Sequence, residues 1–280
     1  MSTLTLQAPA KLNLTLRVLG RRDDGFHEID TLMVKLPGLA DTLGFSESDG
    51  LALACDDASL PVGEENLVIK AARAYEAAAG IKCKFAISLQ KAIPHGAGLG
   101  GGSSDAAATL RGLDRLHDGM LGTGRLLEIA AGIGSDVPFF ITAGAARCRG
   151  RGEQIEPLAT PPPQLRVLLL KPAFAVETPD AYRRWQESAE LPGIDCQPQK
   201  LDGMELVNDL ERPVFAKHRF LAELKQWLLA REECAAALLA GSGSTMFAVL
   251  RDGADAAIVA RAARDELDPG LWWWSGMTGG

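Results

Sequence analysis

This chain of 280 residues has only five cysteines, and it has no apolar run long enough to span a membrane. The cysteines are Cys55, Cys83, Cys148, Cys196 and Cys234. They are scattered, odd in number and never paired as Cys-x-x-Cys, so the sequence predicts reduced thiols in a cytoplasmic protein. The four histidines show no zinc-ligand spacing, so a structural metal is not expected.

The chain also has fewer basic than acidic residues. The chain carries 29 Lys and Arg against 36 Asp and Glu, a formal net charge of −7, which argues against a nucleic-acid or anionic-membrane partner. An anionic ligand would have to be met locally, by backbone amides and a few placed cations. The first residues lack the basic flank and long apolar core of a signal peptide. A hydrophobic content of 47% indicates an ordinary globular protein with one large domain or two of average size.

The most informative stretch is PHGAGLGGGSSDAAA, residues 94–108. Its five glycines remove the Cβ atoms that would keep a ligand away from the backbone. Two serines and an aspartate then offer capping oxygens, and an alanine run of high helix propensity follows. A glycine-rich bend that leads into a helix presents free N–H groups and the positive end of the helix dipole. It therefore predicts a phosphate-binding loop rather than a flexible linker.

Two common phosphate motifs do not fit this loop. Gly96, Gly98 and Gly101 match a dinucleotide fingerprint formally, but the following helix runs into a loop at residues 117–122, where that fold needs a strand. A P-loop needs Gly-Lys-Ser/Thr after the glycines, and Gly102 stands directly before Ser103.

The hydrophobic patterns predict strands and helices mixed along the chain. Alternation over residues 12–18 indicates a first strand with one buried face, and a return strand is expected near residues 29–33. Helices are expected at 66–79, after the glycine-rich loop and at 124–131, and a strand at 82–90. Thr160-Pro161-Pro162-Pro163 is the candidate interdomain linker. These patterns predict an α+β fold with largely antiparallel sheets.

Two charged residues could serve phosphoryl transfer. A kinase that acts on an alcohol needs a phosphate cradle, a metal, a carboxylate aimed at the hydroxyl and a nearby cation. Asp136 and Lys11 can supply the last two. The alternatives are a solvated surface lysine and an aspartate that caps a turn or helix.

Four motifs together resemble the GHMP kinase superfamily. They are PAKLNL at residues 9–14, GFHE at 25–28, the loop at 94–108 and GSDVPFF at 134–140. Within the superfamily, the pairing of the first two is similar to the 4-diphosphocytidyl-2-C-methylerythritol kinases. Thr178-Pro179, Asn208-Asp209 and Gly241-Ser242-Gly243 extend the resemblance almost from end to end.

The resemblance implies a ribosomal-protein-S5-like domain over residues 1–158 and a ferredoxin-like domain over residues 164–280. It implies catalysis in the cleft between them, with Asp136 as the base and Lys11 holding that carboxylate and the reacting hydroxyl. Asn13, Thr178 and Asp136 would belong to the substrate site. His27 would read the cytosine edge, while Phe26, where the family commonly has tyrosine, and Tyr182 would stack on the base. Alternatively, Tyr182 only packs on the linker and His27 is a turn residue.

ATP and Mg²⁺ are the implied cofactors. The predicted ATP site consists of Asn66, Pro94, Gly96, Gly98, Leu99, Gly100, Gly101, Gly102, Ser103 and Ser104. The protein ligands of the metal cannot be read from the sequence, although Ser104 is a candidate neighbour. No role is assigned to His95 or to the Trp272–Trp274 run.

The predicted activity is phosphorylation of the C2 hydroxyl of 4-diphosphocytidyl-2-C-methyl-D-erythritol in non-mevalonate isoprenoid biosynthesis. The predicted partner is this small molecule, with the chain as a monomer or weak homodimer. A homoserine or mevalonate kinase would share Asp136 and the loop but would not need the cytosine residues. A ligand-binding protein that kept the fold without catalysis would not need Lys11 or Asp136.

Overall fold

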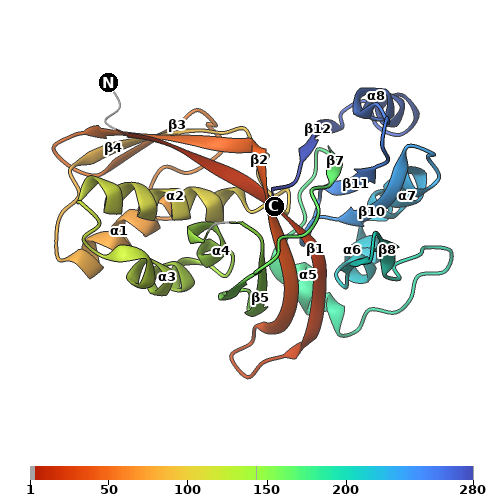
Figure 1. The fold of residues 1–280 in the computed structure, drawn as a ribbon, viewed down its shortest axis with the longest axis horizontal. Coiled ribbons are helices and arrows are strands. Elements are labelled where there is room, and N and C mark those ends of the chain that lie inside the picture. The colour runs from red at the N-terminus through yellow and green to blue at the C-terminus, as the bar shows by residue number, and fades with distance from the viewer. Residues whose placement is uncertain (1–3, 143, 280) are drawn as a thin grey trace.

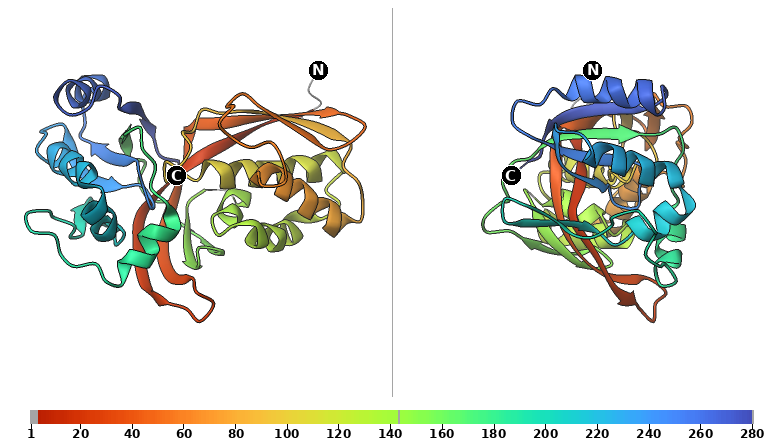
Figure 2. Two further views of the ribbon diagram at one scale, coloured as in Figure 1. Left: turned by 180° about the vertical axis from the view of Figure 1, so that it is seen from behind. Right: turned by 90° about the vertical axis from the view of Figure 1, so that its right-hand side faces the viewer.

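The computed structural model describes residues 4–142 and 144–279, and it contains two lobes joined by a pair of long strands, which run along the top of the first lobe and then bend down between the two lobes (Figure 1). These strands, β1 (Leu4–Arg21) and β2 (His27–Glu47), pair antiparallel along almost their whole length. The return strand predicted near residues 29–33 is confirmed, and it continues for many residues beyond the pattern that indicated it. Seen from behind, the two strands still separate the lobes (Figure 2).

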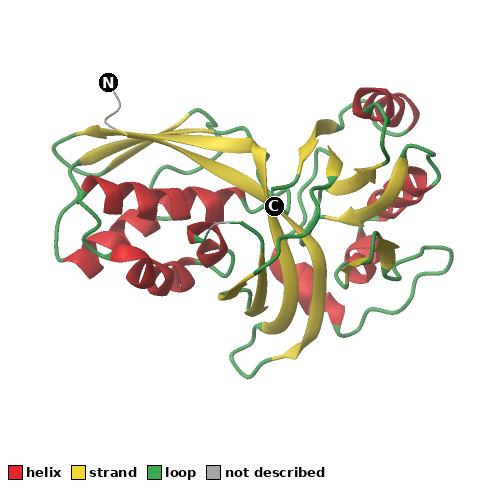
Figure 3. Ribbon diagram, viewed as in Figure 1, coloured by secondary structure: helices red, strands yellow, loops and turns green. Residues whose placement is uncertain are grey.

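The first lobe places helices on one face of a sheet (Figure 3). Its other elements are β3 (Ala52–Cys55), α1 (Leu67–Ala79), β4 (Phe85–Gln90), α2 (Gly101–Leu116), α3 (Gly122–Ile133), α4 (Val137–Ile141), β5 (Ala146–Gly150) and β6 (Gln154–Pro157). The helices predicted at 66–79, after the glycine-rich loop and at 124–131 are confirmed. Their apolar faces and the inner sides of β2 and β4 form one core, which includes Phe45, Tyr75 and Phe139.

The second lobe contains a separate four-stranded antiparallel sheet. The elements from residue 166 onward are β7 (Arg166–Lys171), α5 (Thr178–Trp185), β8 (Gln199–Leu201), β9 (Met204–Asn208), α6 (Glu211–Lys217), α7 (Arg219–Leu229), β10 (Cys234–Leu239), β11 (Met246–Leu250), α8 (Ala256–Glu266) and β12 (Trp272–Met277). The sheet order β10-β11-β7-β12, with helices before β10 and before β12, is a ferredoxin-like βαββαβ arrangement, as expected. The Trp272–Trp274 run opens the edge strand β12.

The chain does not divide cleanly into two consecutive halves. Strand β9 returns to the first sheet, where it pairs parallel with β1 at Thr15 and Leu16, and β8 extends that sheet beyond it. Thr160–Pro163 has no regular structure and connects β6 to β7, as a linker should. The exact limits of 1–158 and 164–280 remain a prediction. The α+β class with largely antiparallel pairing is confirmed, with β1–β9 and β3–β4 as parallel pairs.

The prediction of one buried face for β1 holds from Leu14 to Val18, where buried and half-buried residues alternate, but it fails at Lys11 and Asn13. Ala10, Lys11, Leu12, Asn13 and Leu14 are all buried, because the strand passes between the lobes and both of its faces are covered. Its apolar face forms a third core with the inner face of the second sheet, which supplies Val167, Leu169, Leu238 and Phe247 among others. This apolar contact fixes the lobes to one another.

Two expectations from composition can be compared with the structure. The five cysteines lie within the described ranges and all are free thiols. In residues 4–142 and 144–279, no helix combines the length and apolar content needed to span a bilayer.

Candidate functional site

A cleft of about 1010 Å³ lies where the two lobes meet, and both contribute to its walls. Every residue predicted for the site lines this cleft except Ser104. Five parts of the chain that are far apart in sequence surround this one cleft: the glycine-rich loop, Lys11, Asp136, the Phe26–His27 turn and the start of α5. The roles assigned to these residues remain predictions, but the structure brings the residues together.

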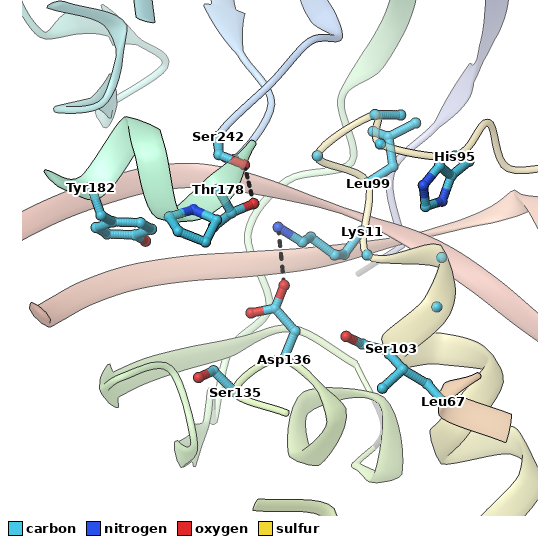
Figure 4. Close-up of a pocket in the computed structure, with 18 of the residues that line it drawn as sticks. Lys11, Leu67, His95, Leu99, Ser103, Ser135, Asp136, Thr178, Tyr182 and Ser242 are labelled. Carbon is cyan, nitrogen blue, oxygen red and sulfur yellow. Dashed lines mark hydrogen bonds and ion pairs between the residues drawn. The ribbon is translucent and has the colours of Figure 1, made fainter. Parts of the chain in front are cut away.

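Lys11 and Asp136 form the centre of the cleft (Figure 4). The Lys11 Nζ lies 3.4 Å from Asp136 Oδ2, and the lysine side chain is only 5% exposed against 29% for the aspartate. Asp136 stands at the N-cap position of α4 but makes no capping hydrogen bond with its side chain. The solvated-lysine and helix-cap alternatives therefore do not describe these two residues. A partly exposed carboxylate therefore forms an ion pair with a buried ammonium group at the wall of the cleft.

A chain of hydrogen bonds fixes the position of Lys11. Its Nζ donates to Asn13 Oδ1 at 2.6 Å, and Asn13 Nδ2 donates to Thr31 Oγ1 at 2.8 Å. Thr31 in turn donates to the carbonyl oxygen of Thr15. The Lys11 amide also donates to the carbonyl of Leu99 at 2.9 Å, so the strand that holds the ammonium group also holds the glycine-rich loop. Buried networks of this kind specify one side-chain arrangement because each polar group has a partner.

The glycine-rich loop needs its glycines for two reasons. Gly96, Gly98 and Gly100 have φ of +62°, +76° and +72°, a region that L side chains rarely adopt. A Cβ on Gly98 would lie 2.0 Å from the carbonyl oxygen of Ala240, because the loop presses against the Gly241–Ser244 turn of the second lobe. The loop ends at Gly100, the N-cap of α2, so the first N–H groups of that helix face the cleft.

The serines and Asp105 do not cap α2, contrary to the expectation from sequence. The helix begins earlier, at Gly101, because Gly100 adopts the left-handed conformation that starts it. Ser104 is consequently buried inside the first helical turns, where its Oγ has no hydrogen-bond partner among the described residues. In the same part of the chain, no cluster of three or more His, Cys, Asp or Glu is arranged to hold a metal. The unpartnered Ser104 hydroxyl lies just inside the helix end that borders the cleft, and a hydroxyl oxygen is a ligand of the kind that magnesium takes together with nucleotide phosphates.

Three buried ionisable side chains, which the sequence analysis missed, hold the segment before the glycine-rich loop against the first turns of α2. Lys91 Nζ forms ion pairs with Asp41 and, at 2.8 Å, with Asp105. Asp41 Oδ1 also accepts from the amides of Ala92 and Ile93 at 2.7 and 2.9 Å, which holds the segment that leads into the loop. Burial, with Asp41 close by, raises the pKa of Asp105 to about 7. No local motif marks these residues, since 64 positions separate Asp41 from Asp105.

An aromatic corner closes the other end of the cleft. The rings of His27 and Tyr182 lie 5.3 Å apart at 33°, and Trp185 meets His27 edge-on at 6.1 Å. Burial lowers the pKa of His27 below its ordinary 6.5, and the charge of Arg21 acts in the same direction, so the imidazole is neutral near pH 7. Phe26 is 49% exposed. Tyr182 packs against a small apolar cluster that includes Leu16 and Val18 of β1, and it also borders the cleft. The alternative that it only packs on the linker therefore does not describe it.

The second lobe contributes two further contacts. Thr178, at the start of α5, and Ser242 share a hydrogen bond of 2.7 Å between their hydroxyls (Figure 4). A Cβ on Gly241 would lie 3.2 Å from Lys11 Nζ, so only glycine leaves this space free. The Gly241–Ser242 pair was part of the resemblance but had no predicted role; a Gly-Ser-Gly-Ser run directly after a buried strand is the signal that could have assigned one.

Asn66 has a structural task that the prediction did not include. Its Oδ1 accepts from the Val68 amide and caps α1, and its Nδ2 donates to the carbonyl of Pro61. The residue lines the same side of the cleft as the glycine-rich loop, where Leu67 and Ile93 add apolar surface. Its side chain therefore shapes that wall while its polar atoms are already engaged.

Comparisons with known proteins identify the family. Residues 66–144 match the GHMP kinases N terminal domain, and residues 198–268 match the GHMP kinases C terminal domain. A 4-diphosphocytidyl-2-C-methyl-D-erythritol kinase from Methylacidiphilum infernorum is 38% identical over 95% of this chain and 93% of its own length. The chain belongs to the 4-diphosphocytidyl-2-C-methyl-D-erythritol kinase family of GHMP kinases.

Solved structures agree with this assignment. A crystal structure of 4-(cytidine 5'-diphospho)-2C-methyl-D-erythritol kinase matches the GHMP kinase described here with a TM-score of 0.79 and 37% identity, over 99% of this chain and 100% of the other. A homoserine kinase from Cytophaga hutchinsonii matches with a TM-score of 0.69 at 17% identity, over 98% and 94% of the two chains, which shows a shared fold. The GHMP kinase fold implied by the sequence motifs is confirmed.

The contact between the two glycine turns predicts the effect of Gly98→Ala. The added methyl group would clash with Ala240, and the backbone would be strained at positive φ, so the loop must move. We expect a lower melting temperature and ATP affinity reduced by roughly tenfold or more, measured by thermal denaturation and calorimetry. Gly124→Ala in α3 is the matched control: nothing lies within 4 Å of its added methyl, and it should stabilise by about 0.5–1 kcal/mol. Unchanged melting and ATP affinity in Gly98→Ala would contradict the close contact.

The cluster of Lys91, Asp41 and Asp105 predicts that two similar substitutions lower the free energy of unfolding by different amounts. Asp41→Asn turns an amide donor toward buried Lys91 and should lower the free energy of unfolding by roughly 2–4 kcal/mol. Asp105→Asn removes one of two neighbouring carboxylates and should cost less than about 1 kcal/mol. The measurement is urea unfolding; equal costs would show that the two acids are equivalent.

Asp105 also predicts a pH dependence. Its pKa in the folded protein, about 7, lies above its ordinary 3.8, so between these pH values the folded state holds a proton that the unfolded state releases. The contribution of Asp105 to stability should therefore fall as pH rises from about 4 to 7, and Asp105→Asn should flatten that fall. Unfolding curves at several pH values compare the two proteins. Parallel pH profiles would contradict this assignment.

Proposed function

We propose that this kinase transfers the γ-phosphate of ATP to the C2 hydroxyl of 4-diphosphocytidyl-2-C-methyl-D-erythritol, in non-mevalonate isoprenoid precursor biosynthesis. The observation that carries the proposal is the Lys11–Asp136 pair, 3.4 Å apart, between a phosphate-binding loop and an aromatic corner in one cleft. The phosphoryl donor can occupy one end of the cleft and the acceptor the other. The Lys11–Asp136 pair lies between them, where the reacting atoms would meet.

The donor end is built for a nucleotide phosphate. The first amides of α2 and the positive end of its dipole would bind the β- and γ-phosphates, with Ser103 at the same rim. The wall formed by Asn66, Leu67 and Ile93 would take the adenine. Ser104 would join the phosphates in holding Mg²⁺, which when bound neutralises charge on the transferring group.

The transfer step requires little from the protein beyond position and charge. Asp136 accepts the proton of the C2 hydroxyl as the oxygen attacks the γ-phosphorus. The bond to the bridging oxygen breaks, and ADP leaves. Lys11 stabilises the charge that develops between the hydroxyl oxygen and the phosphoryl group. Its hydrogen bond to Asn13 limits the positions that the ammonium group can take, so little ordering remains to be done during the reaction.

The acceptor end suits a flat base that carries an anionic chain. Phe26 and Tyr182 offer π faces, and neutral His27 offers one donor and one acceptor nitrogen, a pattern that can read the edge of cytosine. Stacking needs only a ring face, so phenylalanine at position 26 can replace the tyrosine common in this family. The Thr178–Ser242 hydroxyl pair lies between this corner and Lys11 and would contact the methylerythritol diphosphate.

The setting of the reaction belongs to the proposal as well. The five free cysteines support a reducing compartment, which in a bacterial cell is the cytoplasm. The monomer or weak homodimer predicted from sequence stays a prediction.

A panel of acceptors tests the proposed substrate. Coupled ADP release should be fast with the cytidylyl substrate and near background with homoserine or mevalonate. Preferred phosphorylation of homoserine would keep the kinase assignment and overturn the substrate. No ADP release with any of the three, together with ligand binding, would favour a non-catalytic protein.

Asp136→Asn tests the base. The amide keeps the shape of the side chain but cannot accept the hydroxyl proton, so kcat should fall by roughly two to four decades while ATP affinity is retained. Asp30→Asn on β2, an acid that pairs with Arg147 outside the cleft, is the control and should turn over normally. Near-normal kcat in Asp136→Asn would leave Asp136 with a purely positional role.

Tyr182→Ala and His27→Ala test the cytosine end. Loss of one stacking ring is worth about 1–3 kcal/mol, so Tyr182→Ala should raise KM for the cytidylyl substrate by roughly ten- to a hundredfold, whereas Tyr182→Phe should change it little. His27→Ala should weaken the preference for the cytidine over the uridine analogue. KM for ATP should stay constant in all three variants. Equal use of cytidine and uridine analogues by the unmodified kinase would argue against this pocket.

A further inference from the structure

Arg151 lines the same cleft as Phe26, although neither the motifs nor the proposed mechanism uses it. It directly follows β5, and its guanidinium carbon lies 4.7 Å from the centroid of the Phe26 ring. A guanidinium group over a ring face at this distance is a cation–π contact. One face of Phe26, a residue that is 49% exposed, is therefore covered by an arginine.

Several contacts hold Arg151 in this position. Its amide donates to Glu153 Oε2 at 2.6 Å, its guanidinium Nη2 donates to the Ala131 carbonyl at 3.4 Å, and Glu153 lies 3.9 Å from its Nε. The side chain is 28% exposed, which is low for an arginine in a turn. These contacts restrict the guanidinium group before any substrate is present.

The turn that carries Phe26 is tied to the turn that carries Arg151. Glu28 accepts from the Gly150 amide at 3.2 Å with one oxygen and from Arg22 at 2.6 Å with the other. The Phe26 backbone is held on both sides, because its amide donates to Asp24 Oδ1 at 3.1 Å and its carbonyl accepts from the Arg22 amide at 2.8 Å. The residue is nevertheless 49% exposed, so the guanidinium contact over one ring face restricts a side chain that otherwise has room to rotate.

We propose that Arg151 is a positioning residue for the substrate base: it covers one face of Phe26 and holds the ring so that the opposite face meets the cytosine. The inference rests on the proposed function, because it assigns a base to the Phe26 side of the cleft. Ordering the ring in advance lowers the entropy that binding must otherwise overcome. It also explains how phenylalanine can serve here without the hydroxyl group that could anchor a tyrosine.

The guanidinium group could instead contact the diphosphate of the substrate directly, and the two roles predict different results. If Arg151 only positions Phe26, its loss should weaken every ligand whose base stacks on that ring. Cytidine, which has no phosphate, should then lose as much affinity as cytidine diphosphate. A direct contact would weaken only the diphosphate. Competitive inhibition by these two compounds separates the roles.

The test compares Arg151→Ala with Arg149→Ala. Arg149 lies two residues earlier, within β5, and pairs with Asp30 and Glu156 away from the cleft, so it matches in residue type and neighbourhood but not in role. Arg151→Ala should raise KM for the cytidylyl substrate and the inhibition constant of cytidine by roughly two- to fivefold, the size of an exposed cation–π contact. The KM for ATP and kcat should not change. Arg151→Lys should restore part of the loss, and Arg149→Ala should behave like the unmodified kinase.

A double-mutant cycle with Phe26→Leu gives the decisive result. If Arg151 acts through the ring, Arg151→Ala should add no further loss once the ring is absent. Additive losses, a loss confined to cytidine diphosphate, or an unchanged KM in Arg151→Ala would each overturn the proposal. If the unmodified kinase binds no cytidine at all, the proposed function itself fails, and the role of Arg151 fails with it.

Discussion

The site depends on strand β1 being packed on both of its faces. Leu12 and Leu14 are buried against the second sheet, and the strand geometry then directs Lys11 and Asn13 to the opposite side, toward Asp136 and the glycine-rich loop. Because the apolar contact is part of a core, the strand has no freedom to rotate or slide without separating the lobes. The ammonium group is therefore held in place by hydrophobic burial some distance from the reaction, and its own hydrogen bonds only complete the arrangement.

Much of this organisation could be read from local patterns, and the remainder could not. The glycine-rich loop was recognisable because Gly98 and Gly100 meet a backbone requirement that few other residues can meet. The burial of Lys11 could not be predicted in this way. The alternation of apolar and polar residues indicates a strand, but it carries no information on what covers the second face of that strand. The support from Asp41 and the contact of Arg151 with Phe26 join residues that only the tertiary fold brings together. The start of α2 was misplaced because Gly100, not a serine, begins it.

Local charge in the cleft runs against the charge of the whole chain. The net charge is −7, yet among the residues that line the proposed site five cations slightly outnumber four acids; the cations are Lys11, Arg21, Lys91, Arg151 and Arg183, and the acids are Asp24, Glu65, Asp105 and Asp136. Three of these cations, Lys11, Lys91 and Arg151, pair with buried or partly buried carboxylates, which restricts them without a bound anion. The net negative charge of the chain disfavours nonspecific binding of polyanions, while the fixed cations inside the cleft give small phosphorylated molecules a local partner.

The return of β9 to the first sheet has a consequence for how the molecule is made. Residues 204–208 lie beside Thr15 and Leu16, so one edge of the first sheet stays uncovered until about three quarters of the polypeptide has left the ribosome. Such long-range pairing slows folding, because a large chain loop must close before the pairing contributes stability. An N-terminal fragment that stops at the proline-rich linker would carry an exposed strand edge, and its natural fate in the cell would be aggregation or recognition by chaperones.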